Sequence, residues 1–260
     1  MEIVYVATPH SRHAEDMKLL IQAGKHVLCE KSFTIDAKQA KEIFALAQEK
    51  HVFVMEAFWT KFIPLYRQIE EILESGKLGE IRAVTAQYGY TTARETRKFD
   101  PALAGGTLLD IGVYALSFLR WFMSSKPDQI LSQVKYAPTG VDEQASILLK
   151  NKEEEMATVI LSLHAKQPKR GTISFDKAYI ELFEYPRGEE AIITYTEDGH
   201  TEVVSVGSTD RALEYEVADM EVAVAGEENR MHLDYTIDVM DMMTSIRKDW
   251  GMRYPEEEEG

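Results

Sequence analysis

The chain has 260 residues, of which 45% are hydrophobic and 28% charged, the composition of a globular protein with a core of ordinary size. Its net charge of −15, from 29 basic and 44 acidic residues, argues against nucleic acid or an anionic membrane as a partner. No uninterrupted run of about 18 apolar residues occurs, so no membrane span is expected. A single cysteine, Cys29, excludes an internal disulfide and predicts a reducing, cytoplasmic environment.

The first 56 residues alternate between strand-like and helix-like patterns. Short apolar runs lie at residues 2–8, 26–30 and 52–56, and amphipathic helices are expected between them, at 13–24 and 34–51. Strands joined by helices of this length form right-handed crossovers, so this segment predicts a small parallel sheet. In an open sheet of this kind, ligands bind at the carboxyl ends of the strands.

After a helix expected at 64–75, the pattern changes to a succession of short strands separated by turn residues. The strand-like runs cover residues 81–90, 129–137, 143–150, 156–164, 171–176, 178–184, 191–196 and 201–206. Further helical patterns lie at 106–123, 212–225 and 231–250. The order predicts an α/β plus α+β protein, in which a partial parallel sheet precedes a large, mostly antiparallel sheet flanked by helices.

Two opposite charges follow the second predicted strand, in the stretch GKHVLCEKSFT. A strand buried in a parallel sheet is normally apolar throughout, so Glu30 and Lys31 at its carboxyl end require an explanation. One explanation is an exposed ion pair of little energetic weight. Alternatively, the Lys31 ammonium can donate to a substrate hydroxyl or lower the pKa of a neighbouring acid.

The stretch AGGTLLDIGVYAL combines a glycine pair with an acid and a tyrosine. Gly105 and Gly106 permit a tight turn that comes close to a ligand. Asp110 and Tyr114 are four residues apart and share one face of the following helix. Thr107 and Asp110 also resemble a capping box, and Tyr114 suits an ordinary core position. Functionally, oxidation of a carbinol needs a proton acceptor, and a tyrosine serves when a nearby ammonium lowers its pKa from ~10.

A polar turn follows the first predicted strand. Thr8 and Pro9 end this strand, and His10 or His13 begins the next helix. A threonine hydroxyl and the amides at a helix start can hold a ribose or an amide group. The two histidines have no third ligand at a suitable spacing, so we expect no metal here.

An aromatic cluster, MEAFWTKFIP, follows the third predicted strand. Phe58, Trp59 and Phe62 can simply seal the junction between two domains. Aromatic rings at such a junction also line pockets for small ring-shaped substrates. The sequence leaves both interpretations open.

Taken together, the segments VATPHSRH, GKHVLCEKS, MEAFWTKFIP and FDPALAGGTLLDIGVYAL resemble a family of NAD(P)-dependent oxidoreductases, named for glucose-fructose oxidoreductase, inositol dehydrogenase and rhizopine catabolism (Gfo/Idh/MocA). The resemblance extends from Glu2 to about Trp250. It is greatest to the branch with dimeric dihydrodiol dehydrogenase and glucose-fructose oxidoreductase, because Tyr114 stands where the sugar- and inositol-oxidising branches usually carry histidine. It implies part of a Rossmann domain at 1–62 and a substrate-binding and dimerisation domain at 63–260.

The resemblance implies a catalytic role for three residues. Lys31 matches the lysine beside the nicotinamide and the reacting carbinol, Tyr114 matches the proposed acid/base, and Asp110 matches an aspartate one turn earlier. The implied cofactor-binding positions are Thr8, Pro9, His10, His13, Glu30, Lys31 and Trp59. The implied cofactor is NADP or NAD, and the implied substrate is a sugar, cyclic alcohol, other polyol or trans-dihydrodiol oxidised at a CH–OH group. A homodimer or higher homo-oligomer is expected through the antiparallel sheet.

The sequence departs from the family pattern in two ways. Ser32 replaces a proline that often follows a cis bond, and a cis bond before serine costs ~3 kcal/mol. No G-x-G-x-x-G is present, so we expect that the strands and glycine-rich turn which hold the cofactor pyrophosphate are missing. The alternative to an enzyme is therefore a non-catalytic module for binding or oligomerisation.

Overall fold

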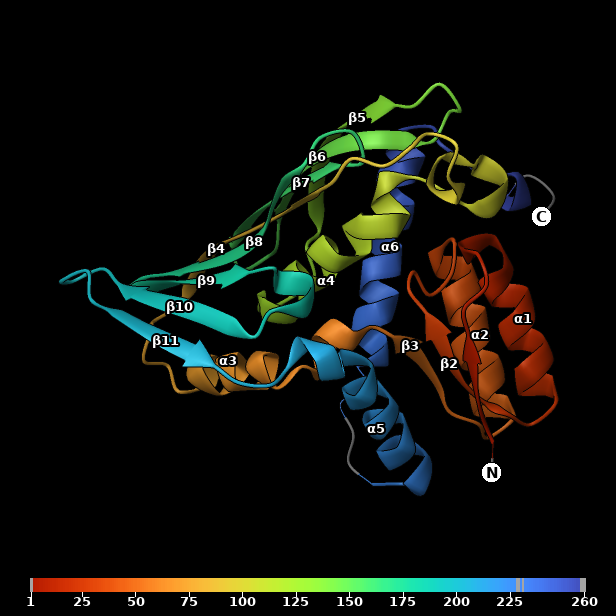
Figure 1. The fold of residues 1–260 in the computed structure, drawn as a ribbon, viewed down its shortest axis with the longest axis horizontal. Coiled ribbons are helices and arrows are strands. Elements are labelled where there is room, and N and C mark those ends of the chain that lie inside the picture. The colour runs from red at the N-terminus through yellow and green to blue at the C-terminus, as the bar shows by residue number, and fades with distance from the viewer. Residues whose placement is uncertain (1, 228–229, 231, 258–260) are drawn as a thin grey trace.

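The computed structural model describes residues 2–227, 230 and 232–257 (Figure 1). Its first part is a parallel sheet with the strand order β1-β2-β3. The strands are β1 (Ile3–Val6), β2 (His26–Glu30) and β3 (Val54–Ala57), and they are connected by helices α1 (His10–Gln22) and α2 (Ala37–Glu49). The small parallel sheet predicted from the sequence is confirmed.

The local sequence explains where these two helices begin and end. Asp36 caps α2, because its carboxylate accepts the N–H of Gln39 at the helix start. The chain leaves α1 through Gly24, whose φ of +70° lies in the left-handed region that glycine adopts without strain. Met17 and Ile21 of α1 are one turn apart and fully buried, so they fix this helix on the sheet.

The second part is an eight-stranded sheet with the order β11-β10-β9-β8-β4-β7-β6-β5. Its strands are β4 (Ile81–Gly89), β5 (Gln129–Tyr136), β6 (Asp142–Lys150), β7 (Met156–Ser162), β8 (Gln167–Phe175), β9 (Ala178–Phe183), β10 (Glu190–Tyr195) and β11 (Thr201–Ser205). Neighbouring strands are antiparallel except β4 and β7, which run parallel. The mostly antiparallel sheet is therefore confirmed.

Helices cover one face of the large sheet and join it to the small one (Figure 1). α4 (Val113–Phe122) packs on β4, β7 and β8, and α6 (Leu233–Asp249) lies between α4 and α2. α3 is Pro64–Glu74, and α5 (Ala212–Ala225) packs on the turn η1 (Trp59–Phe62). The other short helical turns are η2 (Arg97–Phe99), η3 (Pro101–Leu103), η4 (Leu108–Gly112), η5 (Tyr185–Arg187), η6 (Thr209–Arg211) and η7 (Pro255–Glu257). One apolar cluster runs through both parts, so the two sheets share a core.

The stretch Pro101–Phe122 is long and apolar enough to cross a membrane, with a mean hydropathy of 1.6. The stretch contains Asp110 and Arg120, so it is not an uninterrupted apolar run of the kind that was expected to be absent. In the folded chain 89% of the 18-residue window with this hydropathy is buried inside the protein. A central core helix and a membrane helix share the same composition, and burial identifies this one as a core helix.

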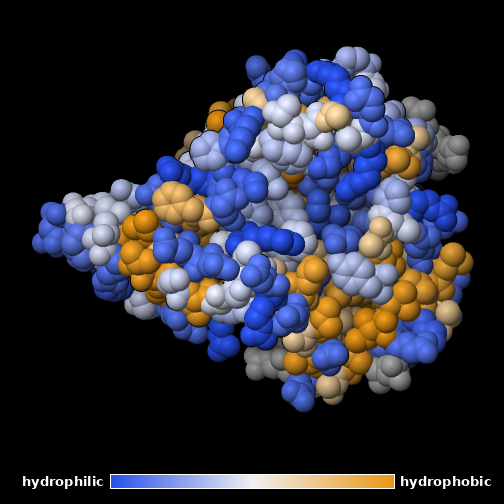
Figure 2. Space-filling view, in the orientation of Figure 1, coloured by the Kyte–Doolittle hydropathy of each residue, from blue (hydrophilic) through white to orange (hydrophobic). Residues whose placement is uncertain are grey.

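The small sheet has an exposed apolar surface. Apolar side chains gather over this part of the molecule (Figure 2), where Ile3, Tyr5 and Phe53 are 38%, 42% and 38% exposed. Within the described residues β1 pairs with β2 alone, so its other edge offers unpaired backbone groups. An edge of this kind favours association with another strand.

Candidate active site

A pocket of about 490 Å³ lies at the carboxyl ends of β1 and β2. The turn after β1, the end of β2, η1, β4 and the helix η4–α4 form its walls. The residues predicted from the sequence that line it are Thr8, Pro9, His10, Glu30, Lys31, Trp59, Asp110 and Tyr114. The structure thus gathers eight of the nine predicted residues around one cavity, in the place where ligands bind to open α/β sheets.

Lys31 and Asp110 form the centre of this pocket. The Lys31 ammonium donates to the backbone oxygen of Asp110 at 2.5 Å and lies 3.6 Å from Oδ1 of its carboxylate. The Lys31 side chain is 13% exposed, and the Asp110 side chain is buried with 6% of its surface exposed. Burial lowers the pKa of Lys31, and the charges of Asp110 and Glu30 oppose this shift. The interpretation of Lys31 as half of an exposed ion pair is therefore wrong.

Asp110 also binds three groups that the sequence analysis missed. Its Oδ2 accepts the Tyr90 hydroxyl at 2.7 Å and lies 3.3 Å from Lys98 Nζ, and its Oδ1 lies 3.9 Å from the Arg97 guanidinium. Burial alone would raise the pKa of Asp110, but Lys31, Lys98 and the hydrogen bond from Tyr90 hold it well below its usual value. The Arg-Lys pair at 97–98 and the alternation of Tyr88 with Tyr90 were the available signals in the sequence.

Tyr114 lies between aromatic rings in the same pocket. Its ring centroid is 5.1 Å from that of Phe58 and 6.0 Å from that of Trp59, and Lys31 Nζ lies 5.1 Å from the Tyr114 ring. Burial raises the pKa of Tyr114 well above its usual value, and the nearby Tyr88 raises it further. The expectation that a nearby ammonium lowers the pKa of Tyr114 below its usual value is therefore wrong. Tyr114 is protonated at neutral pH.

The helix that carries Asp110 and Tyr114 begins with a π-helical turn, η4, before α4. The predicted capping box is wrong: Thr107 donates its hydroxyl to the backbone oxygen of Asp142, and the Asp142 carboxylate accepts the N–H of Leu108. Gly106 has a φ of +121°, and a Cβ there would lie 2.1 Å from Asp142 Oδ1. The close approach at this glycine is therefore to Asp142 rather than to a ligand.

The loop after β2 is fixed from several sides. The Lys31–Ser32 peptide bond is cis, as in the proline-containing pattern, and the Ser32 hydroxyl donates to the backbone oxygen of Leu109 at 2.7 Å. The N–H of Phe33 donates to the buried carboxylate of Glu56. Lys31 is therefore presented to the pocket by a loop anchored to both η4 and β3.

The two histidines have different positions. His10 lines the pocket and its Nδ1 lies 3.0 Å from the backbone oxygen of Ala104, while burial and the charge of Lys31 lower its pKa to about 3. His13 lies behind the pocket wall. Its two ring nitrogens lie 2.9 and 2.8 Å from the backbone oxygens of Ser32 and Thr8, so it ties together the two loops that line the pocket.

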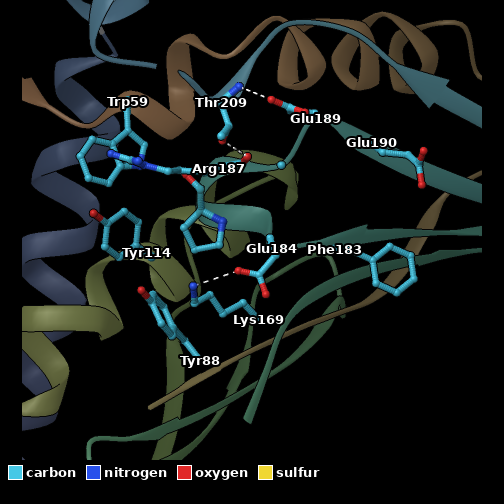
Figure 3. Close-up of a pocket in the computed structure, with 12 residues that line it drawn as sticks. Trp59, Tyr88, Tyr114, Lys169, Phe183, Glu184, Arg187, Glu189, Glu190 and Thr209 are labelled. Atoms are coloured by element: carbon cyan, nitrogen blue, oxygen red, sulfur yellow. Dashed lines mark hydrogen bonds and ion pairs between the residues drawn. The ribbon is translucent and has the colours of Figure 1, made fainter. Parts of the chain in front are cut away.

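A second pocket of about 600 Å³ shares Trp59, Tyr88 and Tyr114 with the first (Figure 3). Its other walls come from β8, β9 and the segment after β9. Figure 3 shows Arg187 lying over Trp59 and Lys169 directed at Glu184, and this ion pair measures 2.9 Å. The two pockets together place Tyr114 between a cavity at the small sheet and a cavity at the large sheet that is lined by both aromatic and charged side chains.

The chain is an α/β protein in which two pockets lie where a small parallel sheet meets a large, mostly antiparallel sheet. Residues 1–58 match the sequence profile described as an oxidoreductase family with an NAD-binding Rossmann fold, and residues 66–181 match the GFO/IDH/MocA C-terminal domain. The chain belongs to the GFO/IDH/MocA oxidoreductase family. The family resemblance seen in the sequence is confirmed.

Curated relatives include trans-1,2-dihydrobenzene-1,2-diol dehydrogenases. The Mus musculus protein is 33% identical over 183 residues, which are 70% of this chain and 55% of that protein. The Sus scrofa protein is 38% identical over 150 residues, 57% of this chain and 45% of that protein. The chain spans about half the length of the curated relatives it matches.

Solved structures with the same fold include KijD10, a 3-ketoreductase from Actinomadura kijaniata in complex with NADP. It is 23% identical with a TM-score of 0.81, over 95% of this chain and 77% of that one. An aldose-aldose oxidoreductase from Caulobacter crescentus is 20% identical with a TM-score of 0.84, over 97% and 78%. At these identities the similarity establishes the fold.

Proposed function

We propose that this chain carries the active site of an NAD(P)-dependent oxidoreductase that acts on a CH–OH group of a sugar, cyclic alcohol or trans-dihydrodiol. The observation that carries the proposal is the convergence of Lys31, Asp110 and Tyr114 in one buried pocket at the carboxyl edge of the small sheet. Dihydrodiol dehydrogenase activity in relatives at 33–38% identity supports the substrate class.

The residues around the pocket fit the nicotinamide riboside end of NADP or NAD. Thr8 and Glu30 supply oxygens that can accept hydrogen bonds from ribose hydroxyls or a carboxamide, and Lys31 supplies a donor. Trp59 and Tyr114 supply flat apolar walls for a ring. A bound nicotinamide supplies or accepts the hydride at the substrate carbon.

Tyr114 exchanges the proton. In carbonyl reduction, its hydroxyl gives a proton to the substrate oxygen as that oxygen gains charge, and the resulting phenolate recovers a proton from water. In carbinol oxidation the same proton moves in the reverse direction, from the substrate oxygen to the phenolate. The raised pKa of Tyr114 makes the protonated form dominant, which suits the reductive direction at neutral pH.

Lys31 and Asp110 position the reacting groups. Because the Lys31 ammonium lies beside the Tyr114 ring, it stabilises both the developing phenolate and negative charge on the substrate oxygen. The Asp110 carboxylate keeps this buried lysine charged and correctly placed. Tyr90, Lys98 and Arg97 hold Asp110 in turn.

We further propose that the chain forms a homodimer through the face of the large sheet that the helices leave open. Leu131 of β5 and Leu148 of β6 are cross-strand neighbours and are 72% and 50% exposed. Ile160 of β7 extends this apolar surface and is 40% exposed. Exposed apolar side chains next to one another on a sheet face favour association with a second copy.

The proposed activity is tested by incubating the 260-residue chain with NADPH or NADH and a panel of cyclic diketones and keto sugars, and by the reverse reaction with cyclic diols and sugars. The expected result is cofactor oxidation that depends on the carbonyl compound and is lost in Lys31→Met. A folded chain that turns over none of these compounds in either direction would contradict the proposal.

A further inference from the structure

We propose that Arg187 binds an anionic group of the substrate, a carboxylate or a phosphate, so that the preferred substrates are acidic sugars or acidic cyclic alcohols. The inference deepens the proposed function and rests on it for the identity of the reacting group. It begins from one charged residue of the pocket on the large sheet that the proposed chemistry does not use.

The backbone holds Arg187 in a fixed position. The Pro186 oxygen accepts hydrogen bonds from Trp59 Nε1 at 2.9 Å and from the Thr60 hydroxyl at 2.7 Å. The Arg187 oxygen accepts the Thr209 hydroxyl at 2.5 Å. The short turn η5 is therefore tied to η1 on one side and η6 on the other, which presents the arginine side chain to the pocket in a defined direction.

The Arg187 side chain lies on an aromatic wall of the active site. Its Cζ is 4.0 Å from the centroid of the Trp59 ring, and that ring is 6.0 Å from the centroid of Tyr114 (Figure 3). A guanidinium over an aromatic face keeps its N–H groups in its own plane, where they remain free to bind an oxyanion with two parallel hydrogen bonds. The short separations place Tyr114 and Arg187 within reach of opposite ends of one monosaccharide-sized molecule.

The charge of Arg187 has no partner carboxylate within ion-pair distance in the part of the chain that the structure describes. The acidic residues of the pocket lining either bind other groups or lie away from the Arg187 side chain. Glu184 binds Lys169 at 2.9 Å, and the Glu189 carboxylate accepts the N–H of Thr209. Glu190 lies at the far end of the pocket in Figure 3.

One more acid, Glu216 of α5, acts on the same region. Burial raises its pKa to about 8, with a further contribution from Glu30, so this side chain is largely uncharged at neutral pH. The lining of this pocket holds two cations, Lys169 and Arg187, and three glutamates, and among the described residues Arg187 is the cation of this lining that makes no ion pair. A charge of this kind beside a catalytic group selects substrates that carry the opposite charge.

The test compares the binding of glucose, glucuronate and glucose 6-phosphate to the whole chain by isothermal titration calorimetry, with and without saturating NADP. We expect at least one anion to bind more tightly than glucose, by roughly tenfold to a hundredfold for a charge-assisted, bidentate contact. Arg187→Met should abolish this difference, and Arg187→Lys should retain part of it because lysine keeps the charge without the fork. The preference between glucuronate and glucose 6-phosphate identifies carboxylate or phosphate as the group bound.

Lys152→Met is the matched control, because it removes one positive charge from a turn where the Lys152 side chain is 72% exposed. It should leave the anion preference intact, and melting curves should show that each variant is folded.

Equal binding of all three sugars, no binding of either anion, or a preference that survives Arg187→Met would overturn the inference. Turnover of neutral substrates without an anion preference would refute this inference alone. Arg187-dependent anion binding without hydride transfer would refute only the proposed function.

Discussion

The Lys31 ammonium donates to the backbone oxygen of Asp110 at 2.5 Å and lies 3.6 Å from the carboxylate of the same residue. One aspartate thus fixes both the position and the charge of the lysine beside Tyr114. Without this carboxylate, only the smaller contribution of Glu30 would oppose the effect of burial, which favours the neutral form of the Lys31 side chain. The pair is therefore the electrostatic centre of the site.

Asp110→Asn tests this relationship. It removes the carboxylate that compensates Lys31, Lys98 and Arg97, so the melting temperature should fall, by an amount corresponding to about 3–5 kcal/mol for a broken buried pair. The reaction rate should fall as well, and the activity that remains should require a lower pH, because the pKa of Lys31 decreases. Asp176→Asn, which breaks an exposed pair with Arg82, is the control and should change little. Wild-type activity with an unchanged pH profile would contradict the role of Asp110.

Tyr114→Phe should lower kcat by about 10²–10⁴-fold, the usual contribution of a positioned proton donor. Within the described residues the Tyr114 hydroxyl makes no hydrogen bond, so the fold should be unaffected and the melting temperature nearly constant. Tyr88→Phe is the matched control, because Tyr88 lines both pockets without a proposed part in proton transfer. An unchanged kcat in Tyr114→Phe would remove Tyr114 from the mechanism.

The raised pKa of Tyr114 predicts opposite pH dependences for the two directions. Carbonyl reduction uses the protonated phenol, which is present below its pKa, so its rate should stay level through neutral pH and fall only in strongly alkaline solution. Carbinol oxidation uses the phenolate, so its rate should rise steadily with pH. Initial rates measured in both directions test this point. An oxidation rate that decreases from neutral to alkaline pH would show that another group exchanges the proton.

The raised pKa of Glu216 predicts that the stability of the folded chain depends on pH. Its folded-state pKa is raised to about 8 from an ordinary value of 4.5, so the folded chain keeps a proton that the unfolded chain has lost between these values. Stability should therefore decrease as the pH rises from about 4.5 to 8. Glu216→Gln removes this contribution, and its melting temperature should exceed that of the wild type most clearly at pH 8 or above. Parallel melting curves for the two proteins at every pH would contradict the assignment.

The open face of the large sheet predicts the assembly state. Leu131→Glu and Leu148→Glu place charges on neighbouring strands of this face and should shift the protein toward monomer in sedimentation or light-scattering measurements. Leu19→Glu is the control, because Leu19 is 59% exposed on α1 and lies outside the large sheet. If all three variants kept the mass of the wild type, the sheet face would not be the interface.

Much of the fold could be predicted because it depends on local patterns. The alternation of strands and helices in the first 56 residues specifies a parallel sheet, and the carboxyl end of a parallel strand specifies where Lys31 lies. The short spacing of Asp110 and Tyr114 placed both on one helical segment, although that segment begins as a π-helical turn. These inferences needed no knowledge of tertiary contacts.

The remaining features depend on contacts between distant segments. Lys98 and Tyr90 reach Asp110 because β4 and η2 pack beside η4, an arrangement that no local pattern specifies. The raised pKa of Tyr114 follows from its burial among the rings of Phe58, Trp59 and Tyr88, which come from distant parts of the sequence. Gly106 is required by Asp142, which lies in the first position of β6. The sequence therefore predicted the reacting groups better than it predicted their environment.

A fluorescence titration of the 260-residue chain with NADPH and NADH tests whether Lys31, Asp110 and Tyr114 form a nicotinamide site. We expect saturable binding with a Kd in the micromolar range, and markedly weaker binding in Lys31→Met at an unchanged melting profile. A folded chain that binds neither cofactor up to millimolar concentration would contradict the assignment of this pocket.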